Sequence, residues 1–470
     1  MNAASRAALV WFRRDLRDFD HAALAAASAV HSPIYGAFVF DTEILDALPS
    51  RADARVTFIW ESVRELCEAL AQRGVALHAC HGRAREEIPR LARELGVVAV
   101  FANRDYEPQA IVRDEAVARH LGRDGIAFHA SKDQVLYEAD EIRTAAGTAY
   151  SVFTPYKRAW LSRINAQSTA PHAVRLPARL RAKPPPLPTL EAMGFVRRET
   201  VVKPGMSGAR RAWAEFRARL RNYAAERDFP AMAGTSGLSA HLRFGTLSIR
   251  ELVRGARASR STAAATWLSE LAWREFFFAV LVARPDVVDH AYRREFDKLE
   301  WEEDESAWRA WREGRTGYPL VDAGMRELAA QGTLHNRVRM VTASFLVKDL
   351  GIDWRRGERH FASLLLDYDL AANNGNWQWC ASTGCDAQPW FRIFNPVTQS
   401  KRFDPDGTYI RRWAPELARV DVGNIHAPWE MSAAEQARAG CVIGIDYPAR
   451  IVSHEKARGA TLERYGALHS

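Results

Sequence analysis

Three segments of the sequence concentrate side chains that bind anions, aromatic rings or hydrogen-bonding edges. The first covers residues 234–239 (GTSGLS) and places glycines and hydroxyls directly before a predicted helix. Such a segment offers hydroxyl donors and free backbone N–H groups to an anion such as a phosphate. An ordinary helix cap and turn has the same composition, so residues 234–239 alone favour a cap over a binding site.

The second segment covers residues 267–277 (WLSELAWREFF) and predicts one helix. Glu270, Trp273 and Arg274 project from neighbouring positions of that helix, and Trp267 lies nearly two turns from Arg274. A carboxylate, an aromatic ring and a guanidinium can therefore share one cleft. A core helix with packing tryptophans and a solvated charged edge explains the same residues equally well.

The third segment covers residues 367–379 (DYDLAANNGNWQW) and holds two Asp, three Asn, one Gly and two Trp. This composition is unusual for a helix that is buried in an apolar core. Asn side chains tolerate turns and act both as donors and as acceptors toward a ligand. We therefore expect a polar pocket with aromatic walls at this segment.

Several common motifs are absent. The sequence has no GxGxxG after its first predicted strand, no Walker A motif, no HExxH and no deaminase zinc signature. These absences argue against a conventional Rossmann dinucleotide enzyme, a P-loop NTPase and a zinc hydrolase. The five cysteines are few, odd in number and scattered, which fits reduced thiols in a cytosolic protein. We expect no metal site.

The first 130 residues contain the elements of an α/β domain, because short apolar runs alternate with helical patterns. Continuous apolar runs fit the strands of a doubly wound, mostly parallel sheet covered on both faces. The expected strands are 7–12, 34–40, 75–79, 97–102 and 126–129, and the expected helices are 21–30, 54–73, 85–95 and 107–121.

A connector and a helical region follow. Residues 165–208 are rich in Pro, Arg and Ala, which indicates a surface linker. Beyond it, Trp213, Phe216, Leu220 and Tyr223 share one helical face. Further helices are expected at 249–257, 262–283, 322–331, 337–350 and 356–366. We therefore expect an α/β domain at 1–130, an inter-domain connector at 131–206 and a larger α-helical domain at 207–470.

The charge balance permits a polyanionic partner without proving one. Lys and Arg number 65 against 57 Asp and Glu, a net charge of +8. No apolar stretch approaches the roughly 18 residues of a membrane span, and no signal peptide is visible. We expect a cytoplasmic protein that does not bind membranes.

Taken together with four further motifs, these segments resemble the DNA photolyase/cryptochrome family. The further motifs are residues 11–17 (WFRRDLR), 317–323 (GYPLVDA), 335–340 (HNRVRM) and 391–396 (FRIFNP). Each motif is weak alone, but the ordered set runs through nearly the whole chain. Within the family, the sequence is most similar to the bacterial class I cyclobutane pyrimidine dimer photolyases.

The resemblance implies a light-driven lyase in which reduced FAD passes an electron to a pyrimidine dimer, the cyclobutane ring splits and the electron returns. Asn373 would face flavin N5, and Arg339 would pair with Asp367 beside the flavin. The full set implied for FAD is Tyr223, Thr235, Ser236, Gly237, Leu238, Ser239, Trp267, Arg274, Arg339, Asp367, Asp369 and Asn373. Trp377, Trp354 and Trp301 would carry electrons between the flavin and the surface.

The resemblance also implies damaged DNA as the partner and a flipped-out dimer as the substrate. Glu270 and Asn336 would hydrogen-bond the pyrimidine edges, Trp273 and Trp379 would flank the dimer, and Met340 would pack under it. Contacts to DNA are implied for Arg227, Glu270, Trp273, Arg274, Asn336, Arg337, Arg392, Gln399 and Lys401. No obligate protein partner is implied, and we expect a monomer.

A second, antenna chromophore is implied for the N-terminal domain, with Arg14 and Asp105 as its site. Residues 103–108 fit the deazaflavin-type pattern at Asp105 at least as well as the pattern for a reduced folate, which expects an acid at the position of Ala110. The choice between the two chromophores stays open.

Three other functions compete with dimer repair. A cryptochrome has the same fold and signals without repair, but it usually carries a C-terminal extension that is not apparent here. A (6-4) photolyase is expected to place a His near position 336, where this chain has Asn336. The third is a basic flavoprotein that only binds nucleic acid.

Overall fold

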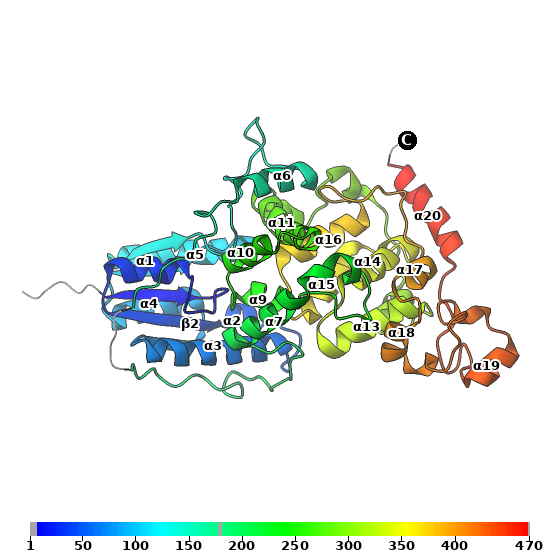
Figure 1. The fold of residues 1–470 in the computed structure, drawn as a ribbon, viewed down its shortest axis with the longest axis horizontal. Coiled ribbons are helices and arrows are strands. Elements are labelled where there is room, and N and C mark those ends of the chain that lie inside the picture. The colour runs from blue at the N-terminus through cyan, green and yellow to red at the C-terminus, as the bar shows by residue number, and fades with distance from the viewer. Residues whose placement is uncertain (1–6, 177–180, 469–470) are drawn as a thin grey trace, which may run out of the picture. The chain divides into compact units, whose positions relative to one another are not determined.

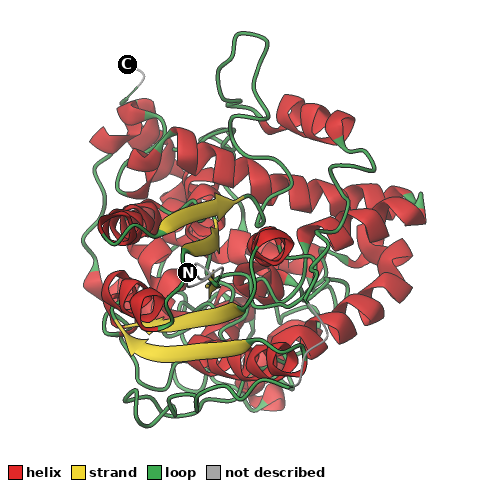
Figure 2. Cartoon of the chain, turned by 90° about the vertical axis from the view of Figure 1, so that its left-hand side faces the viewer, coloured by secondary structure: helices red, strands yellow, loops and turns green. Residues whose placement is uncertain are grey.

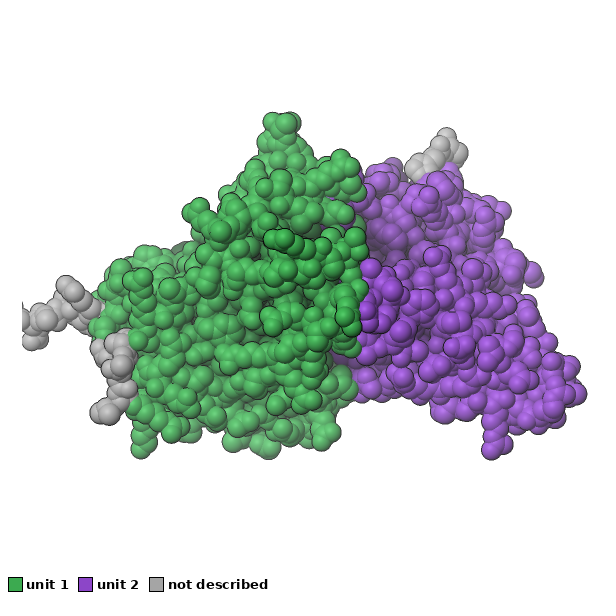
Figure 3. All heavy atoms as spheres, in the orientation of Figure 1, with its two compact units in different colours: residues 1–150, 154–221, 236–283 green, residues 151–153, 222–235, 284–470 purple. Residues whose placement is uncertain are grey.

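The chain folds into two compact units in a computed structural model that describes residues 7–176 and 181–468. Unit 1 comprises residues 1–150, 154–221 and 236–283, and unit 2 comprises residues 151–153, 222–235 and 284–470 (Figure 3). Each unit is thus assembled from segments that are distant in the sequence. The domain boundaries expected near residues 130 and 206 remain predictions.

Unit 1 contains a five-stranded parallel sheet in the order β3-β2-β1-β4-β5. Its strands are β1 (Ala8–Phe12), β2 (Ile34–Asp41), β3 (Ala76–Gly82), β4 (Ala99–Asn103) and β5 (Ala127–Ser131). In the register, Leu9 pairs with Tyr35 on one side and with Val100 on the other. Each expected strand is present, with ends shifted by at most three residues.

Helices cover both faces of this sheet (Figures 1 and 2). The helices between strands are α1 (Ala22–Val30), α2 (Thr42–Leu45), α3 (Ala54–Gln72), α4 (Ala84–Glu94) and α5 (Pro108–Arg123). Leu9 and Trp11 share a buried cluster with Ile88 of α4 and Val117 of α5. Every residue of β1 is buried, as the continuous apolar strands predict, and the sheet is therefore doubly wound.

Unit 1 also contains α7 (Gly205–Arg219), α9 (Ser239–Phe244), α10 (Ile249–Ser259), α11 (Thr262–Ala283) and most of α6 (Phe153–Arg163). A buried ion network ties α10 to the residues around the sheet. Arg250 donates to Asp20 and to Asp133, each at 2.8 Å, and Arg17 donates to Asp133 at 2.6 Å. Burial raises the pKa of Asp133, but Arg17 and Arg250 outweigh it and hold that pKa well below its usual range.

Unit 2 is helical. Its helices are α8 (Tyr223–Glu226), α12 (Glu305–Arg312), α13 (Pro319–Gln331), α14 (Asn336–Ser344), α15 (Trp354–Leu364), α16 (Leu370–Ala381), α17 (Pro396–Phe403), α18 (Thr408–Trp413), α19 (Ala433–Ala439) and α20 (His454–Gly466). The single helix expected at 337–350 is wrong in one respect, because α14 ends at Ser344 and continues as a π-helical turn, Phe345–Asp349. The polar segment 367–379 forms α16 after its cap at Asp369.

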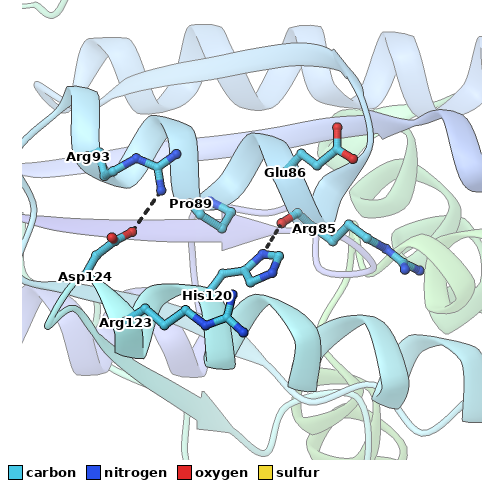
Figure 4. Close-up of a pocket in the computed structure, with 7 residues that line it drawn as sticks. All are labelled: Arg85, Glu86, Pro89, Arg93, His120, Arg123 and Asp124. Atoms are coloured by element: carbon cyan, nitrogen blue, oxygen red, sulfur yellow. Dashed lines mark hydrogen bonds and ion pairs between the residues drawn. The ribbon is translucent and has the colours of Figure 1, made fainter.

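A surface hollow of about 280 Å³ lies between α4 and α5 (Figure 4). Arg93 pairs with Asp124 at 2.8 Å across it, and a ring nitrogen of His120 lies 3.1 Å from the Arg85 carbonyl oxygen. None of the expected site residues lines this hollow. Among residues 7–176 and 181–468, no helix combines the length and apolar character needed to cross a bilayer.

One ion pair from the buried network and one from the surface hollow can be removed in parallel to compare their effects on stability. Asp133→Asn removes the carboxylate that Arg17 and Arg250 share and leaves only Asp20 on Arg250, so we expect the free energy of unfolding to fall by about 3–5 kcal/mol at pH 7. Because the pKa of Asp133 is lowered in the fold, this difference should be full above about pH 5 and shrink as the pH falls further.

The control is Asp124→Asn, which removes a largely exposed pair and should change stability by about 1 kcal/mol or less. Urea unfolding followed by tryptophan fluorescence measures both variants. Equal effects of the two substitutions would contradict a stabilising role for the buried network.

Candidate functional site

Helix α11 carries four of the expected site residues of unit 1. Glu270, Trp273 and Arg274 are half-buried on it, and the Trp273 ring stacks on Phe277 at 5.4 Å between centroids. Trp267, two turns earlier, is buried and stacks on Trp213 of α7 at 5.3 Å. The second sequence segment therefore combines packing with a partly exposed polar turn, and the cofactor role expected of Trp267 stays a prediction.

Arg274 contacts two other residues of unit 1, Gln134 and Phe278. Its guanidinium donates to the Gln134 carbonyl oxygen at 2.7 Å and lies 4.7 Å from the Phe278 ring centroid. The contacts to cofactor and DNA expected of Arg274 stay predictions. The next residue, Glu275, is a buried carboxylate that sequence reasoning missed, although an acid inside the apolar run at residues 271–281 was an available signal.

Helix α14 presents the expected substrate residues of unit 2. Its cap, His335, accepts from the Arg337 N–H at 3.2 Å, and burial lowers the His335 pKa to about 4, so this ring is neutral at pH 7. Asn336 is exposed on the first turn, and its Nδ2 lies 3.7 Å from the Met340 sulfur. Arg337 donates to Asp228 at 3.0 Å. Asn336 and Met340 thus lie together on one turn of α14, with Asn336 exposed and Met340 half-buried.

The expected pairing of Arg339 with Asp367 is present. One Arg339 nitrogen donates to both Asp367 oxygens, at 3.1 and 2.9 Å, and Nε donates to the Leu334 carbonyl oxygen at 2.8 Å. This second bond fixes the direction of the guanidinium. The pair has no net charge, and it joins α14 to the residues that precede α16.

Asn373 is oriented by a residue that the sequence did not single out. Its Nδ2 donates to the Glu358 side chain at 2.8 Å and to the Glu358 carbonyl oxygen at 3.1 Å. Burial raises the pKa of Glu358, and the bond from Asn373 opposes this rise. With Nδ2 held in this way, Oδ1 is the atom of Asn373 that can meet a ligand, and it can only accept.

The three expected electron carriers differ in depth within unit 2. Trp377 and Trp354 are buried, whereas Trp301 is half-buried and packs against the same cluster. A Cβ on Gly357 of α15 would lie 2.2 Å from the Trp377 ring, so only glycine leaves room for this indole. The electron-carrying role expected of the three tryptophans stays a prediction.

The remaining expected cofactor residues are mostly near helix starts. Gly237 has a φ of +65° with open space at its Cβ position, and the Ser236 hydroxyl accepts from the Leu238 N–H at 3.4 Å. Asp369 caps α16 by accepting from Ala372, and Tyr223 is buried with Arg227 5.2 Å from its ring centroid. Thr235 and Gln399 are half-buried, while Ser239, Arg392 and Lys401 are exposed and Trp379 is half-buried on α16.

Arg14 and Asp105 meet at the carboxyl ends of β1 and β4, where the strand order reverses and α/β sheets bind ligands. Arg14 donates to Asp105 at 3.1 Å and to Glu107 at 2.9 Å. Burial raises the pKa of Asp105, but Arg14, Arg113 and Arg13 outweigh it and lower that pKa. At the end of β2, Asp41 Oδ2 is buried and has no partner among the described residues.

Comparison with known proteins matches two regions of this fold. Residues 8–177 match the family model described as DNA photolyase, and residues 267–467 match the FAD binding domain of DNA photolyase. The sheet unit and the helical region define a flavin-binding protein built from an α/β and an α-helical part. The chain belongs to the DNA photolyase family.

Its similarity to individual relatives spans nearly the full length. A deoxyribodipyrimidine photo-lyase of Vibrio cholerae is 41% identical over 97% of this chain and 98% of its own. A class III photolyase structure from Agrobacterium tumefaciens has a TM-score of 0.90 and 35% identity over 100% of this chain and 99% of its own. A Synechocystis cryptochrome structure has a TM-score of 0.87 and 28% identity over 98% of this chain and 100% of its own.

The side chains of unit 2 fit FAD. Reduced flavin carries an N–H at N5, and the Asn373 oxygen left by the Glu358 contact is an acceptor. The Arg339–Asp367 pair adds no net charge beside a ring system that carries its own charge when reduced. Asn373, Arg339 and Asp367 would therefore hold the flavin, and the bonds that Asn373 donates to Glu358 and Arg339 donates to Leu334 would fix the directions of these two side chains.

Two helical glycines test the packing of Trp377. Gly357→Ala on α15 forces a methyl group against the Trp377 ring and Leu346, so we expect the free energy of unfolding to fall by about 1–3 kcal/mol. Gly459→Ala on α20 meets nothing within 4 Å and should raise it by up to about 1 kcal/mol, because alanine favours helix. Urea unfolding curves measure both variants, and a neutral Gly357→Ala would show that Trp377 is not tightly packed.

Proposed function

We propose that the chain repairs cyclobutane pyrimidine dimers in DNA, with light driving electron transfer from bound, reduced FAD to a flipped-out dimer. The observation that carries the proposal is Asn373, whose amide nitrogen is held by Glu358 so that its oxygen is left for the flavin. A neutral amide at this place suits a reduced flavin that donates electrons. The identity of 41% over nearly the full length with a deoxyribodipyrimidine photo-lyase supports the same substrate.

The side chains expected at the flavin would bind and orient the cofactor in this proposal. FAD, when bound, supplies the light absorption and the electron that the protein itself lacks. Asn373 Oδ1 would accept from the N–H at flavin N5, and Arg339 with Asp367 would hold the flavin edge. Tyr223 and the hydroxyls and backbone N–H groups of residues 235–239 would bind the FAD phosphates and ribose, and Asp369 would approach the flavin and adenine. Trp377, Trp354 and Trp301 pass electrons inward from the surface.

The dimer is bound by side chains that can meet both its faces and its edges. Trp273 and Trp379 stack against it, Met340 packs beneath it, and Glu270 and Asn336 bond the pyrimidine edges. Arg227, Arg274, Arg337, Arg392, Gln399 and Lys401 contact the DNA around the dimer. Most of these groups are cationic, which suits phosphate contacts that position the strand without reading its sequence.

A second chromophore, a reduced folate or a deazaflavin, is proposed to bind near Arg14 and Asp105 in unit 1. The unpartnered, buried Asp41 oxygen at the same sheet edge supports this place, because a buried polar atom needs a partner. We further propose domains at 1–130 and 207–470 with a connector at 131–206, a cytoplasmic location, and a monomer with no obligate protein partner.

One experiment tests the proposal against its alternatives. The purified chain, loaded with FAD and reduced anaerobically with dithionite, is illuminated with an oligonucleotide carrying one defined lesion. We expect blue light to restore intact pyrimidines from a cyclobutane dimer and to leave a (6-4) product unchanged. Repair of the (6-4) product alone would indicate the other lyase, and flavin photochemistry without repair of either lesion would indicate the cryptochrome function.

Two substitutions separate flavin photoreduction from repair. Trp301→Phe keeps most of the apolar bulk but removes an oxidisable indole, so light-driven reduction of oxidised FAD should stop while repair by pre-reduced enzyme stays near wild type. Trp379→Ala should keep photoreduction and weaken dimer binding through lost stacking of roughly 1–3 kcal/mol per base. Flavin absorbance and dimer loss are the readouts.

The outcome for Trp301 is decisive for its role. If Trp301→Phe abolishes repair even in pre-reduced enzyme, Trp301 is structural or lines the substrate pocket, and the electron-carrying role must be withdrawn.

A further inference from the structure

Glu275 is a buried carboxylate to which the proposed function gives no task. It lies on α11 with 1% of its surface exposed. Three donors converge on it: the Leu136 N–H on Oε1, and on Oε2 the Tyr137 N–H at 3.2 Å and the Trp160 indole N–H at 2.7 Å. The two amides belong to the turn that follows β5, and Trp160 belongs to α6. One side chain therefore joins three segments of unit 1.

Arg274 strengthens the same junction from the adjacent position. It donates to the Gln134 carbonyl oxygen at 2.7 Å, so two consecutive residues of α11 bind the backbone of residues 134–137. Trp273 immediately precedes this pair, and Glu270 lies little more than one turn before it on α11. Any loosening of the junction would act on the turn that carries the proposed dimer contacts.

We propose that Glu275 is a positioning residue, which fixes the dimer-contacting turn of α11 against residues 134–137 and Trp160, and that ionisation of its carboxyl group loosens this attachment. The effect on dimer binding rests on the proposed function, whereas the attachment itself does not.

The electrostatics give the sign of the effect. Burial raises the pKa of Glu275 to about 7, with the three donors and Arg274 acting in the opposite direction. If the junction opens, the carboxyl group is hydrated and its pKa returns to the ordinary value near 4.5. The attached state then binds the proton more tightly than the open state. Attachment is strongest at acidic pH, weakens as the pH rises toward 7, and stays constant above it.

The groups that face Glu275 do not titrate in this range. Burial raises the pKa of Tyr106, Tyr137 and Tyr156, which keeps all three neutral, and Glu275 adds to each rise. Arg274 stays cationic throughout. The pH dependence at this junction is therefore that of Glu275.

Hydrogen exchange of the full-length, FAD-loaded protein measures the attachment directly. After correction for intrinsic exchange, protection of the Leu136 and Tyr137 amides should fall about tenfold per pH unit between pH 5 and 7 and then level off. The Ala291 amide is the control, since it donates to Asp297 at 2.8 Å and the pKa of Asp297 is lowered by its hydrogen bonds despite burial. Its protection should not fall.

Two variants keep the test falsifiable. Glu275→Gln cannot ionise, so the protection of residues 136 and 137 should be flat with pH. Trp160→Phe removes a donor that lowers the Glu275 pKa, so the fall in protection should continue above pH 7. Protection that is flat in the wild type, or that falls equally in Glu275→Gln, would overturn the proposal.

DNA binding tests the positioning role. We expect the wild-type preference for dimer-containing over undamaged DNA to fall severalfold from pH 5.5 to 7.5 and to be flat in Glu275→Gln. Glu275→Ala should weaken dimer binding about tenfold and leave undamaged DNA unchanged; equal loss for both would show a merely structural residue. If the wild type shows no preference at any pH, the proposed function fails, and hydrogen exchange still decides the attachment.

Discussion

A polar group removed from water must be met by hydrogen-bond partners or by an opposite charge, and this requirement shapes the surroundings of the candidate residues in both units. In unit 1, Arg17 and Arg250 enclose Asp133, and Glu275 gathers three N–H groups from two other segments. In unit 2, Arg339 meets Asp367, and Glu358 holds Asn373. In each case a buried polar contact determines the direction in which a neighbouring side chain or helix turn points.

Helix α16 shows how this requirement allows a polar segment to become a helix. Asn374 Nδ2 donates to the Val287 carbonyl oxygen at 2.9 Å, and Gln378 Nε2 donates to the Val287 and His290 carbonyl oxygens at 3.0 and 3.1 Å. With Asn373 bound to Glu358, these amides find partners on neighbouring elements rather than on their own backbone. The helix therefore tolerates residues that favour turns in isolation.

Much of the fold could be predicted because its signals are local. Continuous apolar runs identified the five strands, and the 3.6-residue period identified most helices, including α11 with its full range. The π-helical turn after Ser344 was missed, because residues 341–350 are all buried and a shift of the apolar face therefore does not show in their pattern. The composition of segment 367–379 predicted a polar pocket but not a helix. The helix depends on hydrogen-bond partners of its amide side chains, and these partners lie outside the segment.

The candidate residues were found by motif, but the residues that orient them were not. Glu275 and the Leu136 amide are 139 positions apart in the chain, and Glu358 and Asn373 are 15 apart on different helices. Gly357 carries no chemistry in the sequence and matters only because Trp377 lies against it. Such partners are set by tertiary packing, which spacing within a segment does not encode.

A crystal structure of the FAD-loaded chain with a dimer-containing duplex tests the central claim most directly. That claim is the proposed one, that polar turns of α14 and α16 bind a flipped-out dimer next to the flavin. The account predicts the dimer out of the base stack and against Trp379, with Asn336 on its edge and Asn373 Oδ1 toward N5. A dimer that remains stacked in the duplex, or an Asn373 that turns its nitrogen to the flavin, would contradict it.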